Sequence, residues 1–233
     1  MSELTEAVVN TQTWGWSRHT GFRTNAHVIG RRREHGMQPL RAARKRVVFD
    51  GLVCGIDEAG RGPIAGPVTA AAVILPSSFT VEILDDSKAL TAAQRTDAAS
   101  VIMQSAVSWG IGWATHEEID ELNILRATLL AMARAVEVMA VKPARLLVDG
   151  LYCPFCGIPG IAIVKGDASV PEIMAASILA KTARDAWMEE YARQEPEYLF
   201  DRHKGYPTAE HRRIVLTLGP SRIQRRTFRV SCP

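Results

Sequence analysis

The sequence contains no apolar run that approaches the ~20 residues needed for a membrane-spanning helix. Its opening stretch, "MSELTEAVVNTQTWGWSRHTGF", holds no charged segment followed by an apolar one, so we predict no secretory signal. Both absences favour a cytoplasmic protein that has no membrane partner.

Cysteine is also scarce, with four residues in a chain of 233. Cys153 and Cys156 have the spacing of a zinc knuckle. A structural zinc ion needs four ligands, however, and no second pair follows at a suitable distance. We therefore expect reduced thiols rather than a zinc site.

The formal net charge of +3 is unevenly distributed along the chain. Residues 1–47 carry nine Lys and Arg against three acids, and residues 201–233 carry eight against two. Taken together, the residues after 47 are slightly acidic. A basic C-terminal segment beside an acidic body is compatible with nucleic-acid binding, and a solvated helix face explains it equally well.

The chain divides by pattern into two parts. Residues 1–47 show no strand or helix period over a useful length, so we interpret them as a basic, disordered extension, with a nucleic-acid-binding arm as the alternative. Apolar residues make up 47% of the chain, which is enough for a substantial core. We place that core in one domain of residues 48–233.

The sequence pattern of residues 48–233 predicts strands first and then helices interleaved with strands. This order favours an α/β layered architecture. Capping-box patterns at Thr91–Gln94, Thr115–Glu118 and Ser169–Glu172 mark three helix starts. Strands are predicted over 46–58, 67–75, 106–114, 145–150 and 160–167, and helices over 91–105, 115–140, 169–194 and 208–218.

Acidic residues end three of these predicted strands: Asp57 with Glu58, Asp149, and Asp167. Strand ends are where ligand sites form in open α/β sheets. Neighbouring buried carboxylates are costly unless a cation offsets their charge, and oxygen-only ligands favour Mg²⁺ or Mn²⁺ over zinc. The acids together therefore predict a metal site, although Asp149 alone is explained by a turn and Asp167 alone by a helix cap.

The turn after the first pair of acids is Gly60-Arg61-Gly62. Neighbours on a regular strand point to opposite faces, so Asp57 and Glu58 converge only if the strand breaks at Glu58, which the glycines make easy. The turn also leaves two backbone positions without Cβ around one cation, and we call it the glycine ledge. A nucleic-acid strand could lie over such a ledge; a tight turn with a solvated arginine is the alternative.

Several motifs, in order from about Val48 to the C-terminus, resemble those of the ribonuclease HII family, the type 2 ribonucleases H. They are "GIDEAGRGPIAGPVTAAAVIL", "DDSKALTAAQR", "LLVDG", "VKGDASVPEIMAASILAKTARD" and "HKGYPTAEH". The resemblance implies a ribonuclease H-like fold, with a central mixed β-sheet flanked by helices and a helical C-terminal part. It also implies an endonuclease that hydrolyses the RNA strand of RNA/DNA hybrids and incises at single ribonucleotides embedded in duplex DNA.

By the same resemblance, Asp57, Glu58, Asp149 and Asp167 are the catalytic acids and hold two Mg²⁺ or Mn²⁺ ions. One ion would activate the attacking water and the other would stabilise the leaving 3′ oxygen, which leaves a 3′-hydroxyl and a 5′-phosphate. The sister family, ribonuclease HIII, usually has a glutamate as its fourth acid and a folded N-terminal platform. Here the fourth acid is Asp167 and the N-terminal extension looks unstructured, and both features favour type HII.

The resemblance also implies substrate contacts. The glycine ledge (Gly60, Arg61, Gly62) would recognise the ribose 2′-hydroxyl, and Tyr206 would sense the junction between RNA and DNA. Further phosphate contacts, each explained equally well as a surface cation or a cap, are Lys88, Lys165, Ser169, Lys181 and Arg184.

Two other functions compete with this one. A non-catalytic duplex-binding module would explain Arg61 and the basic C-terminal segment, but acids at three strand ends repel phosphate unless a metal is bound. A metal-dependent DNA nuclease of the same fold would use the same acids and cut all-DNA duplexes. We assign a general-base role to neither His203 nor His211, and we expect a monomer.

Overall fold

The computed structural model describes residues 50–84 and 90–231. The chain divides into two units, Met1–Arg46 and Val47–Pro233, and every described residue belongs to the second. The predicted extension of residues 1–47 lies outside the described residues, so its disorder stays a prediction.

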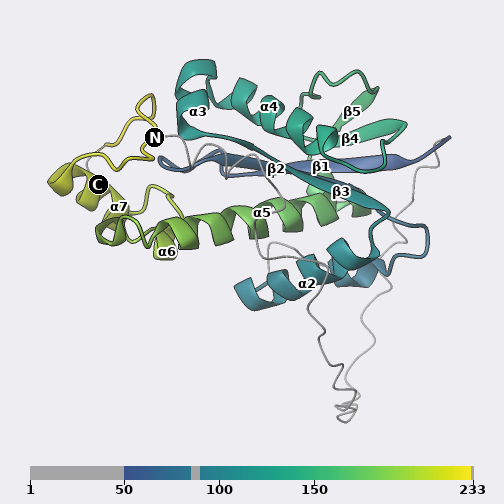
Figure 1. Cartoon of the computed structure of the whole chain (residues 1–233), viewed down its shortest axis with the longest axis horizontal. Helices are drawn as coiled ribbons and strands as arrows, with labels where there is room; N and C mark the ends of the chain where they lie inside the picture. Colours follow the sequence, from purple (N-terminus) through teal and green to yellow (C-terminus); the bar gives the residue numbers. More distant parts are fainter. Residues whose placement is uncertain (1–49, 85–89, 232–233) are drawn as a thin grey trace, which may run out of the picture. The chain divides into compact units, whose positions relative to one another are not determined.

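One mixed sheet of five strands forms the centre of the second unit, in the order β3-β2-β1-β4-β5 (Figure 1). β1 pairs antiparallel with β2 and parallel with β4, while β3 extends the sheet beyond β2 and β5 extends it beyond β4. The strands are β1 (Val53–Ala59), β2 (Val68–Ile74), β3 (Ser108–Ala114), β4 (Arg145–Asp149) and β5 (Gly160–Ile163). The predicted central mixed sheet is therefore confirmed.

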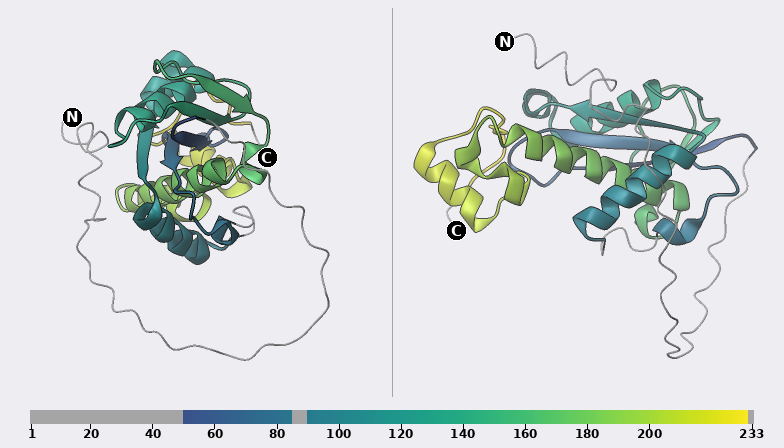
Figure 2. Two further views of the ribbon diagram at one scale, coloured as in Figure 1. Left: turned by 90° about the vertical axis from the view of Figure 1, so that its right-hand side faces the viewer. Right: turned by 60° about the horizontal axis from the view of Figure 1, so that its bottom comes forward.

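Helices cover both faces of this sheet, as Figures 1 and 2 show. On one face lie α3 (His116–Leu122) and α4 (Ile124–Glu137), and on the other lie α2 (Ala92–Ser105) and α5 (Pro171–Tyr191). The chain ends in α6 (Phe200–His203) and α7 (Ala209–Leu218), beyond the end of α5. Short 3₁₀ turns are η1 (Val81–Leu84), η2 (Gly166–Ala168) and η3 (Pro196–Tyr198).

The alternation of side chains along each strand assigns every position to one of two core layers. On β2, Ala70 and Ala72 pack in the layer of α4, whereas Ala71 and Val73 pack in the layer of α2 and α5. Small alanines on both faces of a buried strand let the helices approach the sheet closely. The same alternation decides toward which helix each acid of the site points.

Local capping chemistry starts several helices where the sequence predicts. The Thr91 side chain accepts the Gln94 N–H while the Gln94 side chain accepts the Thr91 N–H, and Thr115 and Glu118 form the same reciprocal pair. Thr208 caps α7 in the predicted position. Such caps satisfy N–H groups that have no partner within the helix.

The predicted capping box at Ser169–Glu172 is wrong. Helix α5 begins at Pro171, after Val170, and no side chain caps it. Proline suits the first helical position because the N–H it lacks would have no intrahelical partner there.

The helix predicted over 115–140 is two helices, because the backbone turns at Asn123, where φ is 71°. The Asn123 side chain accepts the N–H groups of Leu125 and Arg126 at 3.0 and 3.2 Å, and so caps α4. Apolar residues at helical spacing continue across this turn, which is why the pattern does not reveal it.

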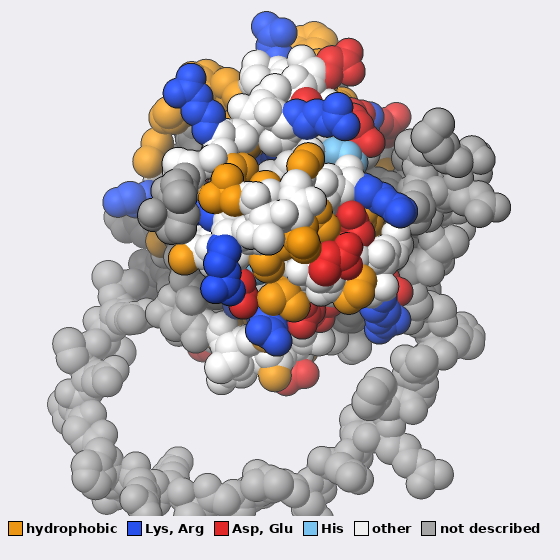
Figure 3. Space-filling view, turned by 90° about the vertical axis from the view of Figure 1, so that its left-hand side faces the viewer, with side chains coloured by type: hydrophobic (Ala, Val, Ile, Leu, Met, Phe, Trp, Pro, Cys, Tyr) orange, Lys and Arg blue, Asp and Glu red, His pale blue; other side chains and the backbone are white. Residues whose placement is uncertain are grey.

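The C-terminal segment carries many of the basic residues. In Figure 3, which faces this end, Lys and Arg side chains are scattered among apolar and acidic ones rather than gathered in one patch. This view favours the solvated-face explanation of their charge. Among the described residues, no helix combines the length and the apolar character needed to cross a membrane.

Candidate active site

The carboxyl ends of two parallel strands bring Asp57 and Asp149 together. Ile56 of β1 pairs with Val148 of β4, so Asp57 and Asp149 come next in the same register. Ile56 and Val148 both pack in the layer of α4, and their neighbours therefore point to the other face, toward α5. Asp57 and Asp149 thus share one edge and one face of the sheet.

Helix α5 begins directly against this edge. A Cβ on Gly55 would stand 2.0 Å from the backbone carbonyl carbon of Glu172, so only glycine permits the contact between β1 and the first turn of α5. Farther along α5, hydrogen bonding from the Ser177 side chain lowers the pKa of Asp57 and so opposes the larger effect of burial. The helix therefore fixes the position of Asp57 and buries it, with 6% of the residue exposed.

Glu58 reaches the site differently from Asp57. Contrary to the break predicted at Glu58, strand β1 continues to Ala59, and Glu58 pairs with Ala70 of β2. The two acids therefore leave opposite faces of the strand, and the Asp57 carboxylate accepts the Glu58 N–H at 2.7 Å. The Glu58 carboxylate pairs with the guanidinium of Arg61 at 3.1 Å.

Asp167 does not end a strand, contrary to the prediction. β5 stops at Ile163, and Asp167 lies in η2 after a left-handed turn at Lys165, where φ is 57°. The Asp149 Oδ1 atom accepts the Gly166 N–H at 2.7 Å and the Asp167 N–H at 3.4 Å. The turn thus places Asp167 directly beside Asp149.

The carboxylates of this corner disfavour each other's charge. Burial raises the pKa of Asp57 well above its ordinary range, and the nearby charges of Glu58 and Asp149 raise that pKa further. Burial also raises the pKa of Glu58; Asp149 adds to the shift, while Arg61 opposes it. Three carboxylates therefore lie within electrostatic reach at a place that favours a positive charge.

The residues present fit a divalent cation by their chemistry: every donor is oxygen, and the charges repel one another. As placed, no group of three or more His, Cys, Asp or Glu side chains within residues 50–84 and 90–231 is arranged to hold a metal ion. Glu58 instead faces Arg61, and Asp149 accepts the Gly166 amide. A bound cation would have to replace Arg61 and the Gly166 amide as the partners of these two carboxylates.

The glycine ledge opens a loop, Gly60–Pro67, that is held from inside the protein. The guanidinium of Arg184, which has no exposed surface, donates to the carbonyls of Pro67 at 2.9 Å, Lys204 at 2.9 Å and Ala65 at 3.2 Å. Because Arg184 is buried and donates to these three carbonyls, its contacts favour a supporting role in the protein over the predicted contact with phosphate. Arg184 belongs to the scaffold of the loop.

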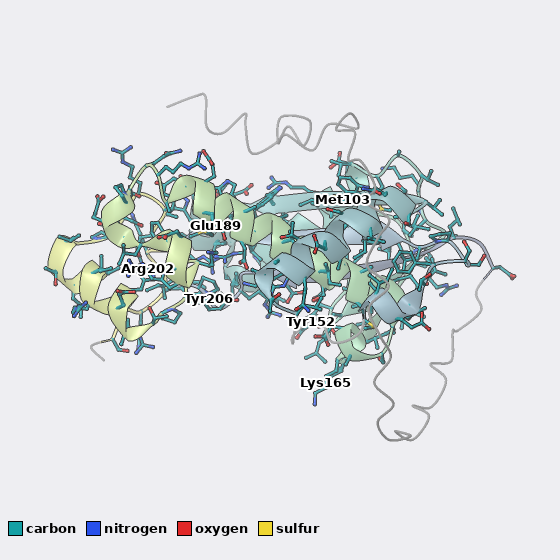
Figure 4. All side chains as sticks on the ribbon, turned by 90° about the horizontal axis from the view of Figure 1, so that it is seen from below. Met103, Tyr152, Lys165, Glu189, Arg202 and Tyr206 are labelled. Carbon is teal, nitrogen blue, oxygen red and sulfur yellow. The ribbon has the colours of Figure 1, made fainter. Side chains whose placement is uncertain are left out.

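Tyr206 lies against the glycine ledge. A Cβ on Gly62 would stand 3.8 Å from the Cε1 atom of the Tyr206 ring. The tyrosine is 39% exposed, and Lys181 Nζ lies 5.5 Å from its ring centroid. In Figure 4, Tyr206 and Tyr152 lie along the same face of the unit. The ledge and Tyr206 therefore form one continuous surface next to the acidic corner.

The sequence profile described as Ribonuclease HII matches residues 54–231, a range that includes every acid of the corner, the glycine ledge and Tyr206. The chain belongs to the ribonuclease HII family.

Individual relatives agree with this assignment. Ribonuclease HII of Dechloromonas aromatica is 54% identical over 182 residues, which cover 78% of this chain and 93% of that protein. Ribonuclease HII of Laribacter hongkongensis is 55% identical over 182 residues, which cover 77% and 92%. The solved ribonuclease H2 from Pyrococcus horikoshii is 26% identical, covers 77% of this chain and 94% of its own, and has a TM-score of 0.64.

These likenesses confirm the predicted ribonuclease H-like fold and the predicted class of enzyme, a ribonuclease H. The family match also favours type HII over the ribonuclease HIII alternative.

The remaining predicted substrate contacts are surface residues or lie outside the described residues. Lys165 is exposed and extends away from the body in Figure 4. Ser169 is exposed, and its N–H donates to Gly166. Lys181 pairs with Asp185 at 2.7 Å, and Lys88 lies outside the described residues. Phosphate binding by these four stays a prediction.

The two histidines of the C-terminal part stack on each other, with ring centroids 4.2 Å apart. His203 Nδ1 accepts the Gly205 N–H at 3.2 Å, and His211 Nδ1 lies 3.0 Å from the Tyr206 carbonyl oxygen, to which it must donate. Both rings therefore support the loop that carries Tyr206.

The described cysteines, Cys54, Cys153 and Cys156, are free thiols. Cys153 and Cys156 pack against the core layer of α4. Burial raises the pKa of Cys54 to about 12, so this thiol is unreactive at neutral pH.

Sequence reasoning missed two residues that shape the site. Ser177 lies in the middle of an apolar helix, and nothing in the pattern separates it from a solvent-facing serine. Arg225 stands in a run of basic residues next to Arg226, yet it is fully buried. No sequence signal distinguishes the buried arginine of that pair from the exposed one.

Proposed function

We propose that this chain is an endonuclease that hydrolyses the RNA strand of RNA/DNA hybrids and also incises duplex DNA at a single embedded ribonucleotide. The products would be a 3′-hydroxyl and a 5′-phosphate. Membership of the ribonuclease HII family supports the coarser statement. The finer one is supported by a single juxtaposition, in which the acidic corner lies next to the glycine ledge and Tyr206.

The four acids Asp57, Glu58, Asp149 and Asp167 would hold two divalent cations, Mg²⁺ or Mn²⁺, which supply a nucleophilic water and charge stabilisation at the phosphate. The chain's own contribution is a set of carboxylates kept close together by β1, β4 and η2. Burial raises the pKa of Asp57 and of Glu58, and nearby carboxylates raise both pKa values further by repulsion that a bound dication would relieve. This repulsion supports metal binding at the corner.

Recognition of the ribose would fall to the glycine ledge. The exposed Gly62 has no side chain, so a sugar can approach the backbone groups of the ledge directly. Arg61 is exposed beside it and is held by Glu58. A 2′-hydroxyl is both donor and acceptor, which suits contact with a bare backbone.

Tyr206 would recognise the junction at which a ribonucleotide is followed by a deoxyribonucleotide. Its ring lies against Gly62, so a nucleotide whose ribose meets the ledge brings the next sugar over the ring. The Lys181 ammonium lies over the same ring, 5.5 Å from its centroid, and adds positive charge there. An aromatic face packs well against a deoxyribose, which lacks the hydroxyl at that position.

The test is a cleavage assay on matched duplexes that carry zero, one or four consecutive ribonucleotides, each with Mg²⁺, with Mn²⁺ and with a chelator. We expect cleavage of the one- and four-ribonucleotide duplexes with metal, none with the chelator, and none of the all-DNA duplex. Cleavage of the all-DNA duplex would favour a DNA nuclease of the same fold. Binding without any cleavage would favour a duplex-binding module.

Size-exclusion chromatography of the same preparation measures the oligomeric state. A monomer and a cytoplasmic location stay predictions from the sequence.

A further inference from the structure

Arg225 is buried without exposed surface, and its guanidinium uses all five of its donors on the backbone of one loop. In the described part of the chain it is bonded to carbonyls rather than to a carboxylate, and the Phe228 ring lies 5.1 Å from it. The acceptors are the carbonyl oxygens of Gly60 (2.6 Å), Pro63 (2.6 Å), Gly66 (2.9 Å), Pro67 (3.1 Å) and Arg61 (3.2 Å).

A buried cation without a carboxylate is costly, since burial disfavours its charge and Arg184 nearby adds a second positive charge. The guanidinium nevertheless stays protonated at neutral pH. Carbonyl oxygens that converge on it from several positions offset this cost. An apolar side chain at position 225 would leave those carbonyls without partners, which is also unfavourable.

These bonds fix the polarity of the glycine ledge. All described peptide bonds are trans, so the C=O of one residue and the N–H of the next point in opposite directions. With the carbonyls of Gly60 and Arg61 turned inward to Arg225, the N–H groups of Arg61 and Gly62 point away from it. Two successive N–H groups presented outward form a concave site for an anion or for an oxygen acceptor.

The C-terminal segment around Arg225 reinforces this orientation. The Arg225 N–H donates to Ile64 at 2.9 Å, and the Gly66 N–H donates to Ile223 at 2.9 Å. On the other side of the loop, the Ile64 N–H donates to Gly205 at 2.9 Å, next to Tyr206. The loop is therefore clamped between the segment that carries Tyr206 and the segment that carries Arg225.

We propose that Arg225 is a positioning residue for substrate recognition: by drawing the carbonyls of the glycine ledge inward, it presents the Arg61 and Gly62 N–H groups to the ribose or phosphate oxygens of the substrate. The inference rests on the proposed function of the ledge. It assigns a role in substrate binding to a residue that never touches substrate. Without Arg225, a carbonyl could turn outward and place negative charge against the phosphate.

The variants Arg225→Gln and Arg225→Lys test this role. Glutamine removes the charge and most of the donors, whereas lysine keeps the charge but loses the planar fork that reaches five acceptors. Arg226→Gln is the matched control, because it removes the same charge from the neighbouring, exposed position. For each protein, kcat and KM are measured on the one-ribonucleotide duplex, and thermal unfolding reports the folded fraction.

For both Arg225 variants we expect KM to rise by about ten- to a hundredfold, with Arg225→Lys affected less, and Arg226→Gln to stay close to wild type. A purely structural role would lower the amount of active enzyme, which reduces apparent kcat and leaves KM unchanged. That result, or an equal rise of KM in Arg226→Gln, would overturn the proposal.

Amide hydrogen exchange of the unmodified protein tests the same point even if the variants fail to fold. We expect fast exchange at Arg61 and Gly62, slow exchange at Ile64 and Gly66, and protection of the first pair when a ribonucleotide-containing duplex is added. Slow exchange at Arg61 and Gly62 in the free protein would contradict the outward orientation.

The two proposals can fail separately. If the wild type cleaves ribonucleotide-containing duplexes while the Arg225 variants keep the wild-type KM, only this inference fails. If the wild type cleaves no duplex, the proposed function fails, and the exchange pattern of the free protein alone decides the orientation of the ledge.

Discussion

The surroundings of Asp57 disfavour the charged form of its carboxylate. It is buried against α5, it faces Asp149, and its backbone neighbour is Glu58. Protein sites where several carboxylates raise one another's pKa are unfavourable for folding and useful for binding cations. The stability of the fold and the activity of the site should therefore respond in opposite directions when this charge is removed.

Asp57→Asn is expected to leave the free energy of unfolding unchanged or higher at neutral pH, while cleavage falls by more than about a hundredfold. The amide removes a disfavoured buried charge and keeps an oxygen for the Glu58 N–H. Because the pKa of Asp57 is raised, the wild type regains stability as the pH falls, and the difference between the two proteins should shrink.

Urea denaturation and the cleavage assay check this expectation together. The exposed Asp97→Asn is the matched control and should change neither quantity. Full activity in Asp57→Asn would remove the acid from the mechanism.

Tyr206→Ala is expected to reduce cleavage of the one-ribonucleotide duplex by about ten- to a hundredfold, with a smaller loss on the long hybrid. The long hybrid offers ledge contacts at many positions, whereas the single ribonucleotide depends on the junction beside the ring. Tyr206→Phe keeps the ring and separates the role of the hydroxyl. Equal losses on both substrates would argue against a junction role.

His211 makes the stability of the Tyr206 loop depend on pH. Burial lowers its pKa from 6.5 to about 4, the Tyr206 carbonyl opposes this shift, and the stacked His203 adds to it. The unfolded chain therefore binds a proton below about pH 6.5 that the folded protein does not bind until about pH 4. Stability should fall as the pH drops through that window, by roughly 3 kcal/mol in total.

His211→Asn tests this dependence because its amide can still donate to the Tyr206 carbonyl. Urea denaturation between pH 7.5 and pH 5 should show a shallower loss of stability in the variant than in the wild type. The slope that remains would come from His203, whose pKa is also lowered by burial, and from the carboxylates. Identical slopes in both proteins would rule out His211 as the source.

At the scale of elements, the junction of α3 and α4 depends on one residue. Asn123 has a positive φ of 71° and caps α4 through its side chain. Asn123→Ala loses the cap and keeps the strained backbone, so we expect it to destabilise the fold by about 2 kcal/mol. Asn123→Gly relieves the strain and should cost less; an equal loss in both variants would contradict this account.

The sequence predicts elements well where the signal is local. The capping boxes at Thr91 and Thr115 specify helix starts through contacts three residues apart, and the apolar strands are bounded by turn residues. It fails where an element ends for a tertiary reason. Strand β5 stops at Ile163 because the backbone turns at Lys165 so that Gly166 and Asp167 can donate to Asp149, a partner outside the local pattern.

At the scale of the whole unit, the sequence indicates which residues form the site but not how they are supported. The acids and the glycine ledge stand in recognisable motifs, so family resemblance identifies them. Arg184 and Arg225 look like surface cations in the sequence, and only the fold shows that both donate to backbone carbonyls of the Gly60–Pro67 loop. Burial of a single charged residue depends on contacts between distant segments, which no local pattern reports.

Asp57 and Asp149, with Glu58 and Asp167, are proposed to share bound divalent cations. Isothermal titration of Mn²⁺ into the wild type, Asp57→Asn, Asp149→Asn and the control Asp97→Asn measures whether they do. We predict that the wild type and Asp97→Asn bind with the same affinity, and that each of the other two variants binds at least about tenfold more weakly. Equal affinity and stoichiometry in all four proteins would contradict the shared site.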